Sequence, residues 1–226
     1  MDRKPAPLVP DGVQQTYSVR TRSHLHSTPD RESAPSLRPP ASPPLPLLLA
    51  IAGSLRAASS NVAVVAAARA LAPPELEVVV YEGLGDLPHF NPDLDTESPP
   101  AAVQDLRRRV GEADALLISS PEYAHGIPGV MKNALDWLVA SLEFPGKPVG
   151  LVNASAASTH AQAALEEVLR TMSADLVAEA CVTLPWTGAK PDLARMIEHP
   201  PLSGAIRGVL QALAARAAQA RAACGG

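Results

Sequence analysis

Four polar residues that follow an apolar run have the right types to bind a phosphate group. They come after the run LLLAIAG and before a helical pattern, and they are Ser54, Arg56, Ser59 and Asn61. Backbone N–H groups at a helix N-terminus point outward and carry partial positive charge, so an anion fits there. Serine and asparagine can donate hydrogen bonds to phosphate oxygens, and arginine can donate as a bidentate fork. The same residues would also suit an ordinary capped helix start, so the spacing alone leaves both interpretations open.

A second polar segment, with a stiff backbone, follows another apolar run. After DALLISS comes the loop PEYAHG, which consists of Pro121, Glu122, Tyr123, Ala124, His125 and Gly126. Pro128 and Gly129 stiffen its far end. Rigid backbone amides suit a planar ligand that is recognised along its edge. We expect Glu122 to orient this loop rather than act as an acid or base, and His125 is equally compatible with a solvated loop position.

Several common catalytic motifs are missing from the sequence. It contains neither the P-loop pattern G-x-x-x-x-G-K-[ST] nor the dinucleotide pattern G-x-G-x-x-G, and it has no G-x-S-x-G nucleophile elbow. The stretch DLDT, 93–96, imitates the start of an aspartate-nucleophile phosphatase, but Pro88 and Pro92 exclude the strand that such a motif needs in front of it. Cys181 and Cys224 lie far apart and form no metal-binding or disulfide pattern.

The elements that must position these loops alternate along the chain from Pro46 onward. The expected strands are the apolar runs 47–53, 76–82, 114–120, 147–155 and 175–185. The expected helices are 59–72, 99–112, a helix that ends at Leu142, 160–172 and 202–222. Runs rich in Val, Leu and Ile without polar alternation are typical of strands that are buried on both faces. The order predicts an α/β fold, a three-layer sandwich with a five-stranded parallel sheet in the order 2-1-3-4-5.

This sheet order brings the two polar loops together. The first and third strands would be neighbours, and their carboxyl ends meet at the switch point where open α/β sheets bind ligands. One loop suits a phosphate and the other suits a flat ring. We therefore expect a mononucleotide between them, above all flavin mononucleotide (FMN).

The same residues resemble the NAD(P)H-dependent FMN reductase family. Its opening pattern, G-S-x-R-x-x-S-x-N, is matched by Gly53, Ser54, Arg56, Ser59 and Asn61. Its second pattern, P-E-Y-N-x-x-x-P-G-x-L-K-N-A-L-D-W, is matched by Pro121, Glu122, Tyr123, Pro128, Gly129 and residues 132–137. The segment LPHFNPDLD, 87–95, is similar to a loop that these proteins carry after their second strand. The resemblance covers residues 47–172 well and the remainder loosely.

The resemblance implies a flavodoxin-like fold and an oxidoreductase. NADPH or NADH would deliver a hydride to bound FMN, and a small acceptor such as a quinone, an azo compound, free flavin or a metal oxyanion would then take the two electrons. The phosphate would be bound by Ser54, Arg56, Ser59 and Asn61. The ring would be fixed by residues 121–126, mainly through backbone groups, with a further contact from Ser155. Such an enzyme needs no catalytic triad, paired carboxylates or metal ligands, because the flavin carries the chemistry.

The sequence departs from the family pattern at three places. Ala124 stands where the family usually has Asn, and Met131 replaces Leu, which conserves the side-chain volume. The segment NASAASTHA, 153–161, lacks the paired glycines often found after the fourth strand. Two other functions keep both loops: a flavin-binding redox sensor without physiological turnover, and a mononucleotide-binding domain that uses no flavin.

Composition limits the other functional classes. Of 226 residues, 46% are hydrophobic, and the net charge of −4 gives no reason to expect a nucleic-acid partner. Residues 1–44 are rich in Pro, Ser, Arg and Thr and have no apolar period, which predicts a disordered extension ahead of an FMN-binding domain at 45–222 and a tail at 223–226. The apolar run near residue 47 is too short to span a bilayer and begins too late for a signal peptide, so we expect no membrane association and a cytoplasmic location.

The helix after the second loop predicts a partner surface. On a helical wheel, apolar residues between Ile127 and Leu142 occupy an arc of roughly 200°, whereas a helix that covers only a sheet needs about 100° or a little more. The surplus favours an exposed apolar patch and a homodimer, or a homotetramer built from two such pairs. A surface loop that covers the patch within one subunit is the alternative.

Overall fold

The computed structural model describes residues 44–224. The predicted disordered extension, 1–44, lies outside the described residues except for Pro44, and of the predicted tail, 223–226, the last two residues lie outside them. None of the helices in the described range is long and apolar enough to cross a membrane.

The core of the fold is a parallel sheet whose strand order is β2-β1-β3-β4-β5, as the sequence predicts. The first four strands are β1 (Leu47–Ala52), β2 (Glu77–Tyr81), β3 (Ala115–Ser119) and β4 (Pro148–Asn153). Every residue of β3 and β4 is buried, which agrees with their unbroken apolar runs. The carboxyl ends of β1, β3 and β4 therefore lie side by side in the middle of the sheet.

The expected fifth strand, 175–185, is divided into two short strands, which corrects the sequence prediction. β5 (Asp175–Leu176) pairs with the start of β4, and β6 (Val182–Thr183) pairs with its end. A 3₁₀ turn at Ala178–Ala180 separates them, because Ala and Glu are poor strand formers. Opposite the turn, a Cβ on Gly150 would lie 2.9 Å from the Cβ of Ala180, so glycine is required for this close approach.

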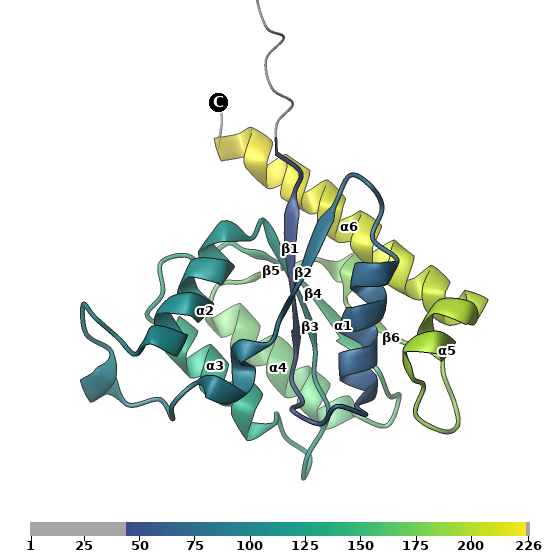
Figure 1. Cartoon of the computed structure of the whole chain (residues 1–226), viewed down its shortest axis with the longest axis horizontal. Coiled ribbons are helices and arrows are strands. Elements are labelled where there is room, and N and C mark those ends of the chain that lie inside the picture. Colours follow the sequence, from purple (N-terminus) through teal and green to yellow (C-terminus); the bar gives the residue numbers. More distant parts are fainter. Residues whose placement is uncertain (1–43, 225–226) are drawn as a thin grey trace, which may run out of the picture. The chain divides into compact units, whose positions relative to one another are not determined.

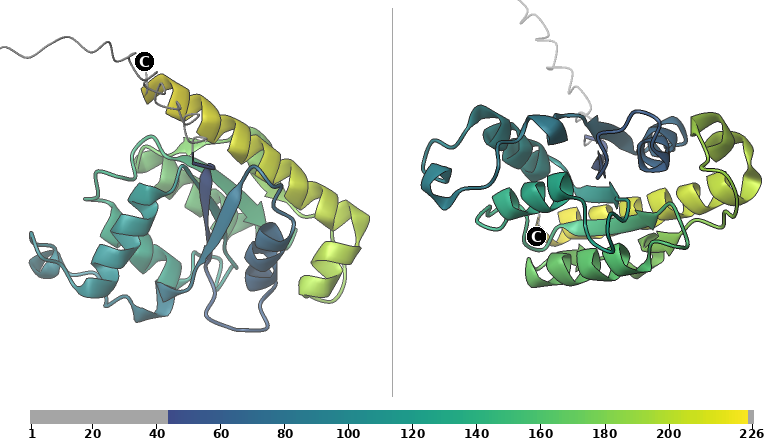
Figure 2. Two further views of the ribbon diagram at one scale, coloured as in Figure 1. Left: turned by 45° about the horizontal axis from the view of Figure 1, so that its top comes forward. Right: turned by 90° about the horizontal axis from the view of Figure 1, so that it is seen from below.

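Helices cover both faces of the sheet (Figures 1 and 2). One face is packed against α1 (Ser60–Ala70), α5 (Leu193–Glu198) and α6 (Pro200–Cys224). The other face is packed against α2 (Ala101–Glu112), α3 (Gly129–Leu138) and α4 (Thr159–Thr171). The short helix α5 is absent from the sequence prediction, and α6 begins two residues earlier than expected.

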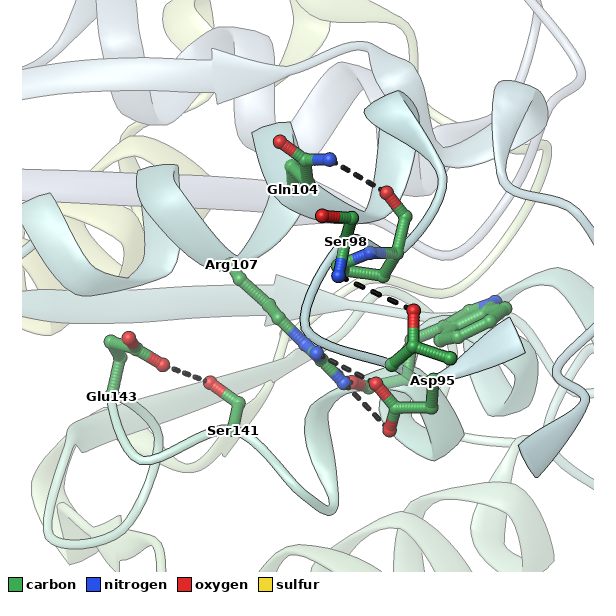
Figure 3. A network of polar contacts seen from close by, with 9 residues as sticks. Asp95, Ser98, Gln104, Arg107, Ser141 and Glu143 are labelled. Carbon is green, nitrogen blue, oxygen red and sulfur yellow. Dashed lines mark hydrogen bonds and ion pairs between the residues drawn. The ribbon is translucent and has the colours of Figure 1, made fainter. Parts of the chain in front are cut away.

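Helix α3 ends at Leu138 and not at Leu142, so its predicted length is wrong. The reason is a contact from α2. The Arg107 side chain donates to the Trp137 carbonyl oxygen, 2.7 Å from Nη2, and thereby occupies an acceptor that a further helical turn would use. Arg107 also forms a bidentate ion pair with Asp95, at 2.9 and 3.0 Å (Figure 3). This half-buried pair fastens the loop after β2 to the end of α3.

The same loop covers much of the apolar surplus on α3. The indole N–H of Trp137 donates to the Pro88 carbonyl oxygen at 2.8 Å, and the Phe90 ring packs edge-on against the indole with ring centroids 5.0 Å apart. Asn133 bonds the same loop on both sides of this contact, to the Pro88 carbonyl and the Phe90 N–H. A surface loop of the same subunit therefore covers the Trp137 side of α3, which is the alternative to a partner surface. Val139 and Leu142, beyond the helix end, stay exposed.

Candidate functional site

A cleft of about 210 Å³ opens at the carboxyl ends of β1, β3, β4 and β6, where the strand order predicts a ligand site. Four loops form its walls. Their lining residues are Ser54, Arg56, Ser59, Ser60 and Asn61; Ser120, Pro121, Glu122 and Tyr123; Asn153, Ala154, Ser155 and Ser158; and Trp186, Gly188, Lys190 and Pro191. Eight of the eleven predicted site residues are in this set. Ala124, His125 and Gly126 are not.

The loop between β1 and α1 presents the start of a helix to the cleft. Ser59 is the N-cap of α1, and its Oγ accepts a hydrogen bond from the Asn61 N–H at 3.2 Å. Ser54 Oγ accepts from the Arg56 N–H at 3.3 Å and so folds the loop back on itself. Within the described chain, the exposed Arg56 guanidinium has no hydrogen bond or ion pair with another residue. The capped N-terminus of α1 and the Arg56 guanidinium thus both place positive charge at the cleft, where an anion would bind favourably.

Two buried hydroxyls in the cleft lack partners among the described residues. They are Ser60 Oγ, in the first turn of α1, and Ser120 Oγ, directly after β3. An unsatisfied buried polar group costs about 1–3 kcal/mol, so such groups call for a ligand or an ordered water. Gly53 makes this arrangement possible, because a Cβ there would lie 2.4 Å from Ser120 Oγ.

Asn61 is buried and joins the central strands. The Ser119 hydroxyl lies 2.9 Å from Asn61 Oδ1 and 2.8 Å from the Val152 carbonyl oxygen. The hydroxyl has a single proton and can donate to only one of these two oxygens. The contacts hold the Asn61 carboxamide against β3 and β4, and its contact with a ligand stays a prediction.

The loop after β3 turns sharply at its tip. Tyr123 and Gly126 exchange two backbone hydrogen bonds, of 3.1 and 3.0 Å, and the two residues between them have left-handed φ values, 50° for Ala124 and 59° for His125. This geometry is that of a tight hairpin turn of the primed type. The tip extends beyond the cleft wall, and contact between its residues and a ligand stays a prediction.

Glu122 fastens this loop to α4. Its Oε2 accepts a hydrogen bond from the Ala161 N–H at 2.9 Å, at the start of that helix. This bond is the main reason why the pKa of Glu122 lies below its usual value, and nearby His125 and His160 act in the same direction. His125 Nδ1 lies 3.5 Å from Glu122 Oε1, and the His125 ring packs edge-on against His160. The structure therefore gives Glu122 the orienting position that we expect.

The loop after β4 is shaped by a buried asparagine that the sequence analysis missed. Asn153 Nδ2 donates to the Ser158 carbonyl oxygen at 3.0 Å, and its Oδ1 accepts from the Ser155 N–H at 3.1 Å. These two bonds place Ser155 at the edge of the cleft. Asn153 is the last residue of β4, so its place at the ligand-binding edge was the available signal.

The fourth wall was also missed. Trp186, Gly188, Lys190 and Pro191 come from the loop between β6 and α5. The loop carries no motif that we recognised. The only signal was that it leaves the carboxyl end of the last strand.

Comparison with known proteins agrees with this geometry. The model of the family "NADPH-dependent FMN reductase" matches residues 46–185. An NAD(P)H-dependent FMN reductase from Pseudomonas aeruginosa is 39% identical over 111 residues, which are 48% of this chain and 60% of that protein. A quinone reductase from Escherichia coli K12 is 36% identical over 105 residues, or 45% of this chain and 56% of that protein. The matches thus span about 60% of the length of these curated relatives.

A solved structure extends the likeness to the fold. The flavoenzyme NAD(P)H:(acceptor) oxidoreductase FerB from Paracoccus denitrificans is similar with a TM-score of 0.62 at 27% identity, over 76% of this chain and 99% of that one. The family match includes the two loops that hold most of the cleft's polar groups. The chain belongs to the NADPH-dependent FMN reductase family.

Proposed function

We propose that this protein is an FMN-dependent NAD(P)H oxidoreductase that passes two electrons to a small acceptor. The observation that carries the proposal is the cleft itself. At the switch point of this chain's sheet a helix N-terminus meets an arginine and two buried hydroxyls that have no partner among residues 44–224. This donor set is the one that a phosphorylated ligand needs.

The residues of the cleft fit FMN. Ser54, Ser59, Ser60 and the Asn61 amide would donate to the phosphate, and Arg56 would supply positive charge. Pro121, Glu122 and Tyr123 form the wall against which the ring would lie, and Ser120 and Ser155 offer further hydroxyls at its edge. FMN supplies the two-electron redox chemistry when it is bound, and the chain supplies position and electrostatics.

The acceptor that we propose is a quinone. Several relatives of the chain are named quinone reductases. The exposed Tyr123 side chain gives the open side of the cleft an aromatic surface, and a flat acceptor could stack there. Azo compounds, free flavin and metal oxyanions remain alternatives, and either NADPH or NADH could serve as the donor.

The proposal is tested by loading the purified protein with FMN, removing free flavin and measuring NAD(P)H oxidation with and without a quinone. Sustained turnover that needs both flavin and quinone supports the oxidoreductase. A protein that keeps its flavin but does not turn over would be a redox sensor. A protein that remains colourless after FMN is added would be a mononucleotide-binding domain of another kind.

We also propose a homodimer that is built on a groove between α3 and α4. The lining of this groove combines apolar Val139, Val168 and Met172 with polar Lys132, Asp136, Glu167 and Thr171. Leu142, three residues after Val139, is 92% exposed. Helix α3 is shorter than the sequence predicts, so its full apolar arc cannot support the dimer. The homodimer proposal rests on these groove residues and on Leu142 instead. Light scattering tests it: a mass near 23.5 kDa, that of one chain, would contradict the dimer.

The remaining assignments are proposals of the same kind. Residues 45–222 would form the FMN-binding domain. The protein would act on small molecules in the cytoplasm, where NAD(P)H is available, without nucleic-acid or membrane partners. Family membership supports these assignments, and cell fractionation would test the location.

A further inference from the structure

One wall of the cleft lies outside the segment that the family model matches. The match ends at residue 185, and Trp186, Gly188, Lys190 and Pro191 come directly after it. Lys190 is the only charged residue among these four.

The added loop is held in a defined shape. The indole N–H of Trp186 donates to the Ala189 carbonyl oxygen at 2.6 Å, which closes a turn directly before Lys190. The same indole packs edge-on against the His199 ring, with ring centroids 5.2 Å apart, and Arg195 lies 5.8 Å from the indole centroid. Pro191 is buried and fixes the other end. Lys190 thus follows an anchored turn, and its position at the cleft is set by the fold.

Charge in the cleft is unbalanced. Arg56 and Lys190 both line it, and within the described residues neither forms an ion pair with a carboxylate. Glu122, the acidic lining residue, directs Oε2 to the Ala161 N–H at the start of α4. A phosphate monoester carries close to two negative charges at neutral pH. The single positive charge of Arg56 would neutralise about half of that charge, and a second cation would neutralise the rest.

We propose that Lys190 is a second phosphate-binding cation of this site, which neutralises the FMN 5′-phosphate together with Arg56. This inference rests on the proposed function, because it assumes that FMN occupies the cleft. An ammonium group on a flexible stem suits this role, since it acts as a point charge and needs no fixed fork geometry. Trp186 would be the positioning residue, which sets the turn that carries Lys190.

The test is a comparison of FMN and riboflavin binding to the full-length apo-protein. Riboflavin has the same ring and lacks the phosphate. Binding is followed by quenching of flavin fluorescence and of tryptophan fluorescence, because Trp186 lines the cleft. The variants are Lys190→Gln, the conservative Lys190→Arg, and Arg69→Gln as the matched control. Arg69 is also exposed and without an ion pair among the described residues, but it lies in the last turn of α1, at the far end from the cleft.

We expect Lys190→Gln to raise the Kd for FMN about tenfold, the effect of one charge-assisted contact, and to leave the Kd for riboflavin unchanged. Lys190→Arg should restore most of the affinity, and Arg69→Gln should bind FMN like the wild type. Added salt should weaken FMN binding more in the wild type than in Lys190→Gln.

Two results would overturn the inference while the proposed function stands. One is an equal loss of affinity for FMN and riboflavin, and the other is an unchanged FMN affinity in Lys190→Gln. If the FMN affinity is unchanged and the KM rises for NADPH but not for NADH, Lys190 would be assigned to the 2′-phosphate of NADPH instead. Failure of the wild type to bind FMN would instead refute the proposed function. Circular dichroism melting of each variant confirms that it is folded.

Discussion

Replacing Ala124 by asparagine should stabilise the protein. Ala124 and His125 are the two central residues of the turn after β3, with φ values of 50° and 59°. In this left-handed region the Cβ of an L-residue lies too close to the neighbouring carbonyl oxygen, at a cost of about 1–2 kcal/mol per residue. Asparagine enters the region more readily, because its short polar side chain can hydrogen-bond the local backbone. The related family pattern has asparagine at this position.

The size of the effect follows from that cost. Ala124 is exposed, so the new side chain displaces no packed neighbour. If asparagine relieves about half of the strain, the free energy of unfolding rises by about 0.5–1 kcal/mol. For a domain of this size that corresponds to a rise in Tm of about 1–4 °C.

The assay is thermal and urea unfolding of the wild type, Ala124→Asn and a matched control. Ala140→Asn is suitable, because Ala140 is also exposed in a turn but is not among the described residues with positive φ. The control should be neutral or slightly destabilised. Equal behaviour of the two variants, or a loss of stability in Ala124→Asn, would refute the strained turn.

Three further predictions concern the cleft and its supports. Arg56→Ala should weaken FMN binding about 10- to 100-fold, since a hydrogen bond to a charged group contributes about 1.5–3 kcal/mol; equal binding of riboflavin and FMN by the wild type would exclude a phosphate at this loop. The lowered pKa of Glu122 means that its ionised form stabilises the folded protein above the ordinary pKa and that this contribution is lost as the pH falls through the lowered pKa of the folded state. Urea unfolding at several acidic pH values should therefore show a steeper loss of stability in the wild type than in Glu122→Gln, and parallel curves would count against the Glu122–Ala161 bond. Removal of residues 1–43 should leave flavin content and Tm nearly unchanged, because all lining residues lie between Ser54 and Pro191; a large fall in Tm would show that the domain needs the removed segment.

The sheet and the two motif loops could be predicted from sequence because their signals are local. Unbroken apolar runs mark buried strands, and the alternation with helices fixes a parallel order. The polar residues of the first loop follow β1 directly. The rule that open α/β sheets bind ligands at the carboxyl ends of their strands therefore predicts their place in the cleft. Ser60 belongs to the same stretch and is absent from the prediction, because its burial in the first turn of α1 is visible only in the structure.

The remaining features depend on contacts between distant parts of the chain. Helix α3 ends early because Arg107, thirty residues before Trp137 in sequence, binds its carbonyl oxygen. The fifth strand divides where Ala180 approaches Gly150, a contact that no local pattern reports. The Trp186–Pro191 wall depends on the contacts of Trp186 with Arg195 in α5 and with His199, the residue that caps α5. The Gly- and Pro-rich composition predicted a turn after β3, but not that its left-handed positions fall on Ala124 and His125.

The central claim is that this cleft binds FMN and that the bound flavin passes electrons from NAD(P)H to an acceptor. The most direct measurement is the visible spectrum of the FMN-loaded protein, after free flavin is removed, during anaerobic addition of NADPH or NADH and then of a quinone. We predict that the flavin absorption is bleached by the nicotinamide and restored by the quinone. A protein that retains no flavin, or whose bound flavin keeps its absorption in the presence of both nicotinamides, would contradict the account.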